Sequence, residues 1–203
     1  MELSNLDGSN GFRMDGVAEF GHSGSSISDA GDVNGDGFDD LIVGAPWAEL
    51  NGPSSGSSYV IFGKASGFNA AMDFSSLDGH NGFRLDGIRY HTAGFSVSTA
   101  GDVNGDGFDD VIIGADNADP NGYSSGSSYV LFGKASGFNP IIDLSSLGRD
   151  DGFRLDGVTA WDNSGWSVST AGDVNGDGLD DLIIGAPWAD PNGEDSGSSY
   201  IIL

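Results

Sequence analysis

The 203-residue sequence has the length of one domain, or of a domain-sized piece of a repeat array. Acidic residues outnumber basic ones by 31 to 7, and the formal net charge of −24 disfavours nucleic acids and anionic membrane surfaces and favours cations as partners. The sequence has no cysteine, which excludes disulfides, thiol catalysis and cysteine-ligated metal sites.

No apolar run approaches the roughly 18–20 residues of a membrane span, so we expect no membrane insertion. The N-terminal sequence MELSNLDGSNG lacks the basic and apolar regions of a signal peptide. If the parent protein is secreted, we expect its signal to lie outside this sequence.

A unit of about 70 residues occurs three times, and its landmarks keep the same order in each copy. The string GFR begins at Gly11, Gly82 and Gly152; DVNGDG begins at Asp32, Asp102 and Asp173; GSSY begins at Gly56, Gly126 and Gly197. One supersecondary unit is therefore repeated along the whole chain.

In chain order, the first unit predicts a strand at GFRMDGV, a short strand over 26–28, an apolar strand over 40–45 and a strand over 58–63. Glycine, asparagine and aspartate separate these segments, and no stretch keeps a 3.6-residue apolar period, so helices should be minor. Four strands per repeat with glycine-rich turns predict an all-β fold, a β-propeller of four-stranded antiparallel blades with three blades in this chain.

We therefore predict one domain over 1–203, with repeats at about 17–87, 88–157 and 158–203. The last repeat lacks an outermost strand, and the spare strand at 11–16 would close a ring or pair with another chain. Since closed propellers have about 4–8 blades, we expect a homo-oligomer (a dimer giving six blades) or part of a longer repeat array.

The acidic loop of each unit has the spacing of a metal site. In the first loop, side-chain oxygens stand at positions 1, 3 and 5 (Asp32, Asn34, Asp36), the carbonyl of Phe38 follows, and Asp40 at position 9 would complete the ligands. Without a cation, three carboxylates would repel one another, and an all-oxygen set favours calcium over zinc, copper or magnesium.

Two alternatives bear on this loop. An EF-hand needs a glutamate at position 12, where this chain has Val43, Ile113 and Ile184, so the EF-hand is rejected. A plain solvated turn remains the other interpretation, and three copies with the same oxygen positions favour the metal. For the position-8 residues Asp39, Asp109 and Asp180 we expect solvated charges that point away from the ion.

These residues resemble the FG-GAP repeat, the blade of the integrin α-subunit propeller. Gly44-Ala45-Pro46 and Gly185-Ala186-Pro187 carry the GAP element, whereas the middle copy reads Gly114-Ala115-Asp116; the FG element is Phe20-Gly21 in the first repeat and is loose in the others. The resemblance implies one Ca²⁺ per repeat, three per chain, in the loop between the first two strands of each blade. The implied ligands are Asp32, Asn34, Asp36, Phe38 and Asp40; Asp102, Asn104, Asp106, Phe108 and Asp110; and Asp173, Asn175, Asp177, Leu179 and Asp181.

The loops opposite the calcium loops differ most between repeats, which is where a repeated scaffold usually carries binding function. They hold Trp47, Trp188, Tyr90, Trp161 and Trp166, so a protein or glycan ligand is expected on that face unless these rings only fill gaps between blades.

Catalysis has little support, because no G-x-S-x-G or phosphate-binding loop occurs and the histidines (His22, His80, His91) stand at non-equivalent places, which indicates surface histidines. Arg13, Arg84 and Arg154 repeat with the blades and are expected to pair with a neighbouring aspartate.

The sequence therefore predicts a calcium-stabilised extracellular or cell-surface propeller module that is not an enzyme and that acts in adhesion or protein–protein interaction. A carbohydrate-binding propeller and an ancillary domain of a secreted hydrolase are the alternatives.

Overall fold

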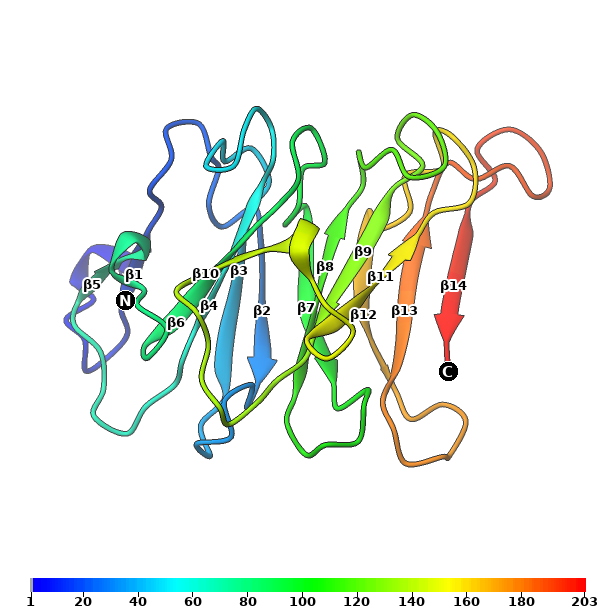
Figure 1. Cartoon of the computed structure of the whole chain (residues 1–203). Helices are drawn as coiled ribbons and strands as arrows, with labels where there is room; N and C mark the ends of the chain where they lie inside the picture. Colours follow the sequence, from blue (N-terminus) through cyan, green and yellow to red (C-terminus); the bar gives the residue numbers. More distant parts are fainter. Residues whose placement is uncertain (1) are drawn as a thin grey trace.

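Three antiparallel sheets stand side by side along the chain in the computed structural model, which describes residues 2–203 (Figure 1). Met1, the first residue of the predicted domain, lies outside the described residues. The first blade contains β2 (Ser26–Gly31), β3 (Asp40–Ala45), β4 (Ser57–Ile61) and β6 (Gly82–Asp86); the second contains β7 (Ser96–Gly101), β8 (Asp110–Ala115), β9 (Ser127–Leu131) and β11 (Gly152–Asp156); the third contains β12 (Ser167–Gly172), β13 (Asp181–Ala186) and β14 (Ser198–Ile202).

The predicted all-β fold of repeated antiparallel blades is confirmed. The helical segments of residues 2–203 are three 3₁₀ turns, η1 (Leu3–Asn5), η2 (Phe74–Ser76) and η3 (Leu144–Ser146). None of them is long and apolar enough to cross a membrane. The third blade has three strands, as expected from the order of the sequence landmarks, so β14 forms its outer edge.

Two short linking strands each pair with a strand that lies earlier in the chain. β10 (Ile141–Asp143) belongs to the second repeat but pairs in parallel with β6, the outer strand of the first blade. In the same way β5 (Ala71–Asp73), from the first repeat, pairs in parallel with β1 (Arg13–Asp15). The sequence analysis did not predict these three-residue strands.

β1 is the spare N-terminal strand that the sequence predicts at 11–16, and its pairing shows where this strand lies. It sits beside β5 at the end of the molecule opposite β14 (Figure 1), so it does not complete the third blade of its own chain. Its pairing with another chain stays a prediction.

The blades pack through their innermost strands, β2 against β7 and β7 against β12. Val97 and Val168, on β7 and β12, are almost fully buried in this packing. At the same contact, a Cβ added to Gly44 would lie 2.1 Å from the carbonyl oxygen of Gly94, so glycine is needed for the close approach of the two blades. The central strands β3 and β8 are buried along most of their length, as their apolar sequences predict.

Candidate metal centre in the acidic loops

The three acidic loops connect β2 to β3, β7 to β8 and β12 to β13, and all three lie along one edge of the molecule, at the bottom of Figure 1. Strand direction alternates within each blade, so this edge also carries the connections that lead from β4 and β9 toward the next outer strand. The acidic loops therefore connect the first two strands of each blade, as predicted.

Within the first loop, side-chain oxygens accept hydrogen bonds from the loop's own backbone. The Asp32 carboxylate accepts from the N–H groups of Asp36 (3.0 Å) and Gly37 (2.8 Å), and Asn34 Oδ1 accepts from Asp36 N–H (2.8 Å). Asp36 Oδ1 then accepts from Phe38 N–H (3.0 Å). The tight wrap depends on Gly37 at φ +88, a left-handed conformation that favours glycine.

The other two loops repeat these hydrogen bonds, and in each of them the first aspartate also accepts from the N–H three residues further on. Asp102 and Asp173 accept from the backbone N–H groups four and five residues further on, and Asp106 and Asp177 accept from the N–H two residues further on. Three copies of one local geometry show that the loop conformation is encoded in the repeated residues themselves.

The aspartate at position 9 is buried in all three loops. The carboxylate of Asp40 accepts hydrogen bonds from the N–H groups of Val33 (3.1 Å) and Gly63 (2.8 Å), and so fastens the loop to the end of β4. Burial, together with the nearby charges of Asp36 and Asp32, raises the pKa of Asp40 to about 7, although the two backbone hydrogen bonds lower it.

Asp110 repeats this arrangement in the second blade. Its carboxylate accepts from the N–H groups of Val103 and Gly133, and burial first, then the charges of Asp106 and Asp102, raise its pKa to about 7. A buried carboxylate beside two others is an environment that a bound cation would relieve.

The donor set fits Ca²⁺ in its chemistry. Each loop carries three carboxylates, one amide oxygen and one backbone carbonyl, all of them hard oxygen donors. Within residues 2–203, no three histidine, cysteine, aspartate or glutamate side chains are grouped closely enough to hold a metal ion as they stand. Hydrogen bonds fix the conformation of each loop but do not close the predicted ligands into a coordination shell, and their binding of Ca²⁺ stays a prediction.

The position-8 aspartates correct one expectation. Asp109 Oδ2 accepts a hydrogen bond from the backbone N–H of Asp32 in the preceding blade (2.8 Å), and Asp180 Oδ2 accepts from Asp102 N–H (3.0 Å). Neither is a solvated charge; each ties its own loop to the loop of the neighbouring blade. Only Asp39, which has no blade before it in the described chain, is exposed as predicted.

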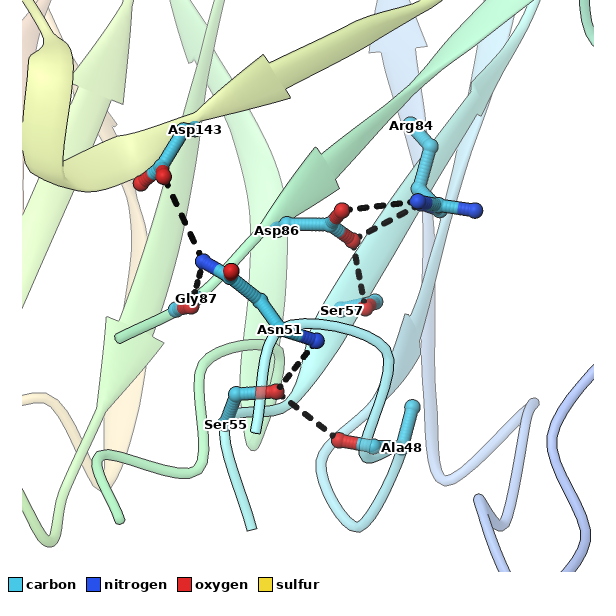
Figure 2. A network of polar contacts seen from close by, with 8 residues as sticks. All are labelled: Ala48, Asn51, Ser55, Ser57, Arg84, Asp86, Gly87 and Asp143. Atoms are coloured by element: carbon cyan, nitrogen blue, oxygen red, sulfur yellow. Dashed lines mark hydrogen bonds and ion pairs between the residues drawn. The ribbon is translucent and has the colours of Figure 1, made fainter. Parts of the chain in front are cut away.

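The repeated arginines pair as predicted. Arg84 forms an ion pair with Asp86 (2.8 Å) two residues along β6, and Arg13 and Arg154 pair in the same way with Asp15 and Asp156. Figure 2 shows that Asp86 also accepts a hydrogen bond from the Ser57 hydroxyl (2.9 Å), so Asp86 connects β6 to β4 through its side chain.

A second part of the network in Figure 2 fixes the loop that follows β3. Asn51 Nδ2 donates to the carbonyl of Gly87 (3.0 Å) and to Asp143 (3.4 Å). The backbone N–H of Asn51 donates to the Ser55 hydroxyl, which in turn donates to the carbonyl of Ala48. Asn121 makes the same bond to the carbonyl of Gly157 in the second blade (2.8 Å). These asparagines hold the loops of the face opposite the acidic loops.

On that face, aromatic rings surround a hollow of about 290 Å³ between the first and second blades. Trp47, Tyr90 and Tyr123 line it together with Thr92 and Asp119. The other predicted aromatic residues pack against neighbouring rings and remain partly exposed. The ring centroid of Trp161 lies 4.4 Å from that of Tyr123, and the centroid of Trp166 lies 4.6 Å from that of Phe95 and 4.4 Å from that of Trp188. Sequence reasoning missed Tyr123, because its equivalents Pro53 and Glu194 are not aromatic.

The histidines do not form a site. His22 and His80 are exposed, as predicted, whereas His91 is half-buried and burial lowers its pKa. The expectation of a surface histidine was therefore wrong for His91, which the loops opposite the acidic edge partly cover.

Blades of antiparallel strands, packed side by side through their inner strands and each carrying one acidic loop, define a protein of the β-propeller class. The FG-GAP repeat profile matches residues 24–61, 93–131 and 164–202, which together make up more than half of the chain. The chain belongs to the FG-GAP repeat family.

Curated relatives of two kinds are similar to this chain. Integrin alpha-4 of Xenopus laevis is 31% identical over 163 residues, which is 79% of this chain and 14% of that protein. Phosphatidylinositol-glycan-specific phospholipase D of Bos taurus is 32% identical over 179 residues, 83% of this chain and 20% of that protein. Integrin alpha-PS5 of Drosophila melanogaster is 32% identical over 162 residues, 79% of this chain and 14% of that protein. The chain thus spans a fifth or less of the length of these relatives.

Proposed function

We propose that this chain is a calcium-stabilised propeller module of an extracellular or cell-surface protein and that it acts in adhesion or protein–protein interaction. The observation that carries the proposal is the acidic loop, repeated three times with one hydrogen-bonding pattern and with a buried aspartate at position 9. Integrin alpha subunits among the relatives support the adhesion role.

In this proposal the ion would be held in each loop by the aspartates at positions 1, 5 and 9, the asparagine at position 3 and the carbonyl at position 7. A bound Ca²⁺ supplies positive charge among carboxylates that otherwise repel one another. Because Asp40 and Asp110 also hold the backbone of the following connection, the same residues would transmit the stabilisation from the loop to the blade.

Calorimetric titration of Ca²⁺ into metal-free protein tests the proposal. We expect three sites per chain, and two sites after Asp106→Asn, which removes one ligand charge but keeps an oxygen to accept from Phe108 N–H. Asp78→Asn is the matched control, because Asp78 is an exposed aspartate that accepts backbone N–H bonds outside the acidic loops. An absence of binding heat in the unmodified chain would overturn the calcium site.

The aromatic hollow favours a second candidate function, carbohydrate binding. Trp47, Tyr90 and Tyr123 offer ring faces beside the polar groups of Asp119, Asn117 and Thr92, a combination that suits the mixed polar and apolar surface of a sugar. In a glycan-array measurement we expect Trp47→Ala and Tyr90→Ala to abolish binding and Phe20→Ala, an exposed ring outside the hollow, to leave it unchanged. No binding by the unmodified chain would reject this candidate.

The phospholipase D relatives favour a third candidate, an ancillary domain of a secreted hydrolase. In that case the chain itself would show no turnover, and its partner would be the catalytic part of the same or another polypeptide. Hydrolysis of ester or glycan substrates by the purified chain that survives substitution in all three acidic loops would instead assign catalysis to this module.

A further inference from the structure

Neighbouring acidic loops are hydrogen-bonded to each other at both internal blade junctions. Asp109, at position 8 of the second loop, accepts from the N–H of Asp32 at position 1 of the first loop (2.8 Å), and its own N–H donates to the Asp32 carbonyl (3.3 Å). Asp180 and Asp102 form the same two bonds between the third loop and the second (3.0 and 3.2 Å). At each junction, a side chain that is not a predicted ligand therefore holds the backbone of a residue that is one.

A second contact joins position 7 of the later loop to position 4 of the earlier loop. A Cβ added to Gly35 would lie 2.3 Å from the ring of Phe108, and a Cβ added to Gly105 would lie 2.9 Å from Cδ2 of Leu179. Position 7 is the residue whose carbonyl is a predicted ligand, so its side chain rests on the backbone of the preceding loop.

Position 9 supplies a third connection at the first junction. Asp110 accepts from the N–H of Gly133 (2.8 Å), and the next residue, Lys134, donates its N–H to the carbonyl of Val33 in the first loop (2.9 Å). The N–H of Val33 in turn donates to Asp40, which is position 9 of the first loop (3.1 Å). Hydrogen bonds thus lead from one predicted ligand to the equivalent ligand of the neighbouring blade.

We propose that the position-8 residues Asp109 and Asp180 are positioning residues that couple ion binding in neighbouring loops, so that the affinity of one loop for Ca²⁺ rises when its neighbour is loaded. This inference rests on the proposed calcium site and adds a regulation of it. In a loaded loop, positions 7 and 9 hold the ion on either side of position 8, and these three positions contact the preceding loop. A loop that is already held loses less conformational freedom when it binds its own ion. Coupling free energies are reciprocal, so the gain acts in both directions along the chain.

Repulsion between bound ions opposes this coupling. The first loop carries four aspartates, Asp32, Asp36, Asp39 and Asp40, so one Ca²⁺ leaves it with a formal charge of −4 + 2 = −2. The loaded loop is still negative, and at about 0.15 M ionic strength charges more than about 8 Å apart are largely screened. A titration at this ionic strength therefore reports mainly on the contacts between the loops.

Chains with two intact loops test the coupling by calorimetric titration of Ca²⁺ in about 0.15 M salt. Asp36→Asn silences the first loop and leaves the second and third, which touch each other. Asp106→Asn silences the second loop and leaves the first and third, which the second blade separates because β2 packs on β7 and β7 on β12. Both chains keep two sites, but we expect positive cooperativity, at least about a fivefold gain in affinity for the second ion, in the Asp36→Asn chain alone.

Substitutions of Asp180 in the Asp36→Asn chain test the position-8 residue itself. Asp180→Ala removes the acceptor of the Asp102 N–H and should reduce the cooperativity while two ions still bind, because Asp180 is not a predicted ligand. Asp180→Asn keeps an oxygen that can accept this bond and should retain the cooperativity. Asp78→Ala is the matched control, because it removes an acceptor of backbone N–H groups outside the acidic loops and should leave the cooperativity unchanged.

Amide hydrogen exchange measured by NMR gives a second readout that does not depend on affinity. When Asp36→Asn and Asp106→Asn are combined, only the third loop is intact. Ca²⁺ should then slow the exchange of the Asp102 amide, which Asp180 holds, several-fold more than that of the Asp32 amide, which Asp109 holds at the other junction. Circular dichroism checks that every variant folds.

The outcomes separate this inference from the calcium site on which it rests. Two independent sites in the Asp36→Asn chain, cooperativity unchanged by Asp180→Ala, or equal slowing of the two amides would overturn the coupling and leave the calcium sites standing. An absence of binding heat in all of these chains would overturn the calcium site, and the coupling with it.

Discussion

At the scale of single residues, the position-8 aspartates show how one sequence position acquires different roles in different repeats. Asp109 and Asp180 lock the loop of the preceding blade through its backbone, and Asp39 faces solvent within its own chain. The loop sequence alone could not distinguish them, because the three residues have the same local neighbours and differ only in what lies across the blade junction.

This difference is measurable as stability. We expect Asp109→Ala to lower the free energy of unfolding by about 1–2 kcal/mol, since it leaves the Asp32 N–H without its acceptor. Asp39→Ala should change the free energy of unfolding by less than about 0.5 kcal/mol, because Asp39 is exposed. Urea denaturation measures both, and equal effects would contradict the cross-blade role of Asp109.

At the scale of the elements, the sequence predicts the long strands well and the short ones poorly. The apolar strand over 40–45 and its repeats appear with the predicted bounds, because a buried strand carries its own pattern of side chains. β5 and β10 are three residues long; β10 pairs with the outer strand of the preceding blade and β5 with the N-terminal strand β1, so neither periodicity nor turn residues mark them. Likewise, the metal loops are recognisable from spacing, but the hollow around Tyr123 depends on loops of two different repeats.

The central strands also carry a prediction about blade contact. Gly114→Ala places a methyl group 2.0 Å from the backbone oxygen of Gly165, so the two blades must move apart, and we expect a loss of about 1–3 kcal/mol. Gly185→Ala should be nearly neutral, because its Cβ would meet only atoms at 3.6 Å or beyond. Thermal or urea unfolding of the two variants compares them directly, and similar losses at both glycines would show that strand geometry, not blade packing, selects glycine.

At the scale of the whole molecule, the charge of −24 makes stability depend on pH and on cations together. The folded-state pKa of Asp40 and of Asp110 is raised from 3.8 to about 7. Metal-free protein is therefore stabilised by these two groups at pH below about 4 and loses that stabilisation as the pH rises through 7.

Ca²⁺ requires the same carboxylates in their ionised form, so its stabilising effect should grow over the same range. We expect the difference in melting temperature between calcium-loaded and chelator-treated protein to be larger at pH 8 than at pH 5. Differential scanning calorimetry at the two pH values measures it, with Asp78→Asn as a control that should behave like the unmodified chain. An equal difference in melting temperature at both pH values would show that Asp40 and Asp110 are not ligands of the ion.

The linking strands give the molecule a mechanical polarity. Because β10 pairs with β6, the outer strand of the first blade is covered by a segment of the following repeat, whereas β14 pairs only with β13 within the described residues. Tension applied to the C-terminal end would therefore peel the third blade first, one strand at a time. The first blade would unfold only after the parallel pairing of β10 with β6 had been broken.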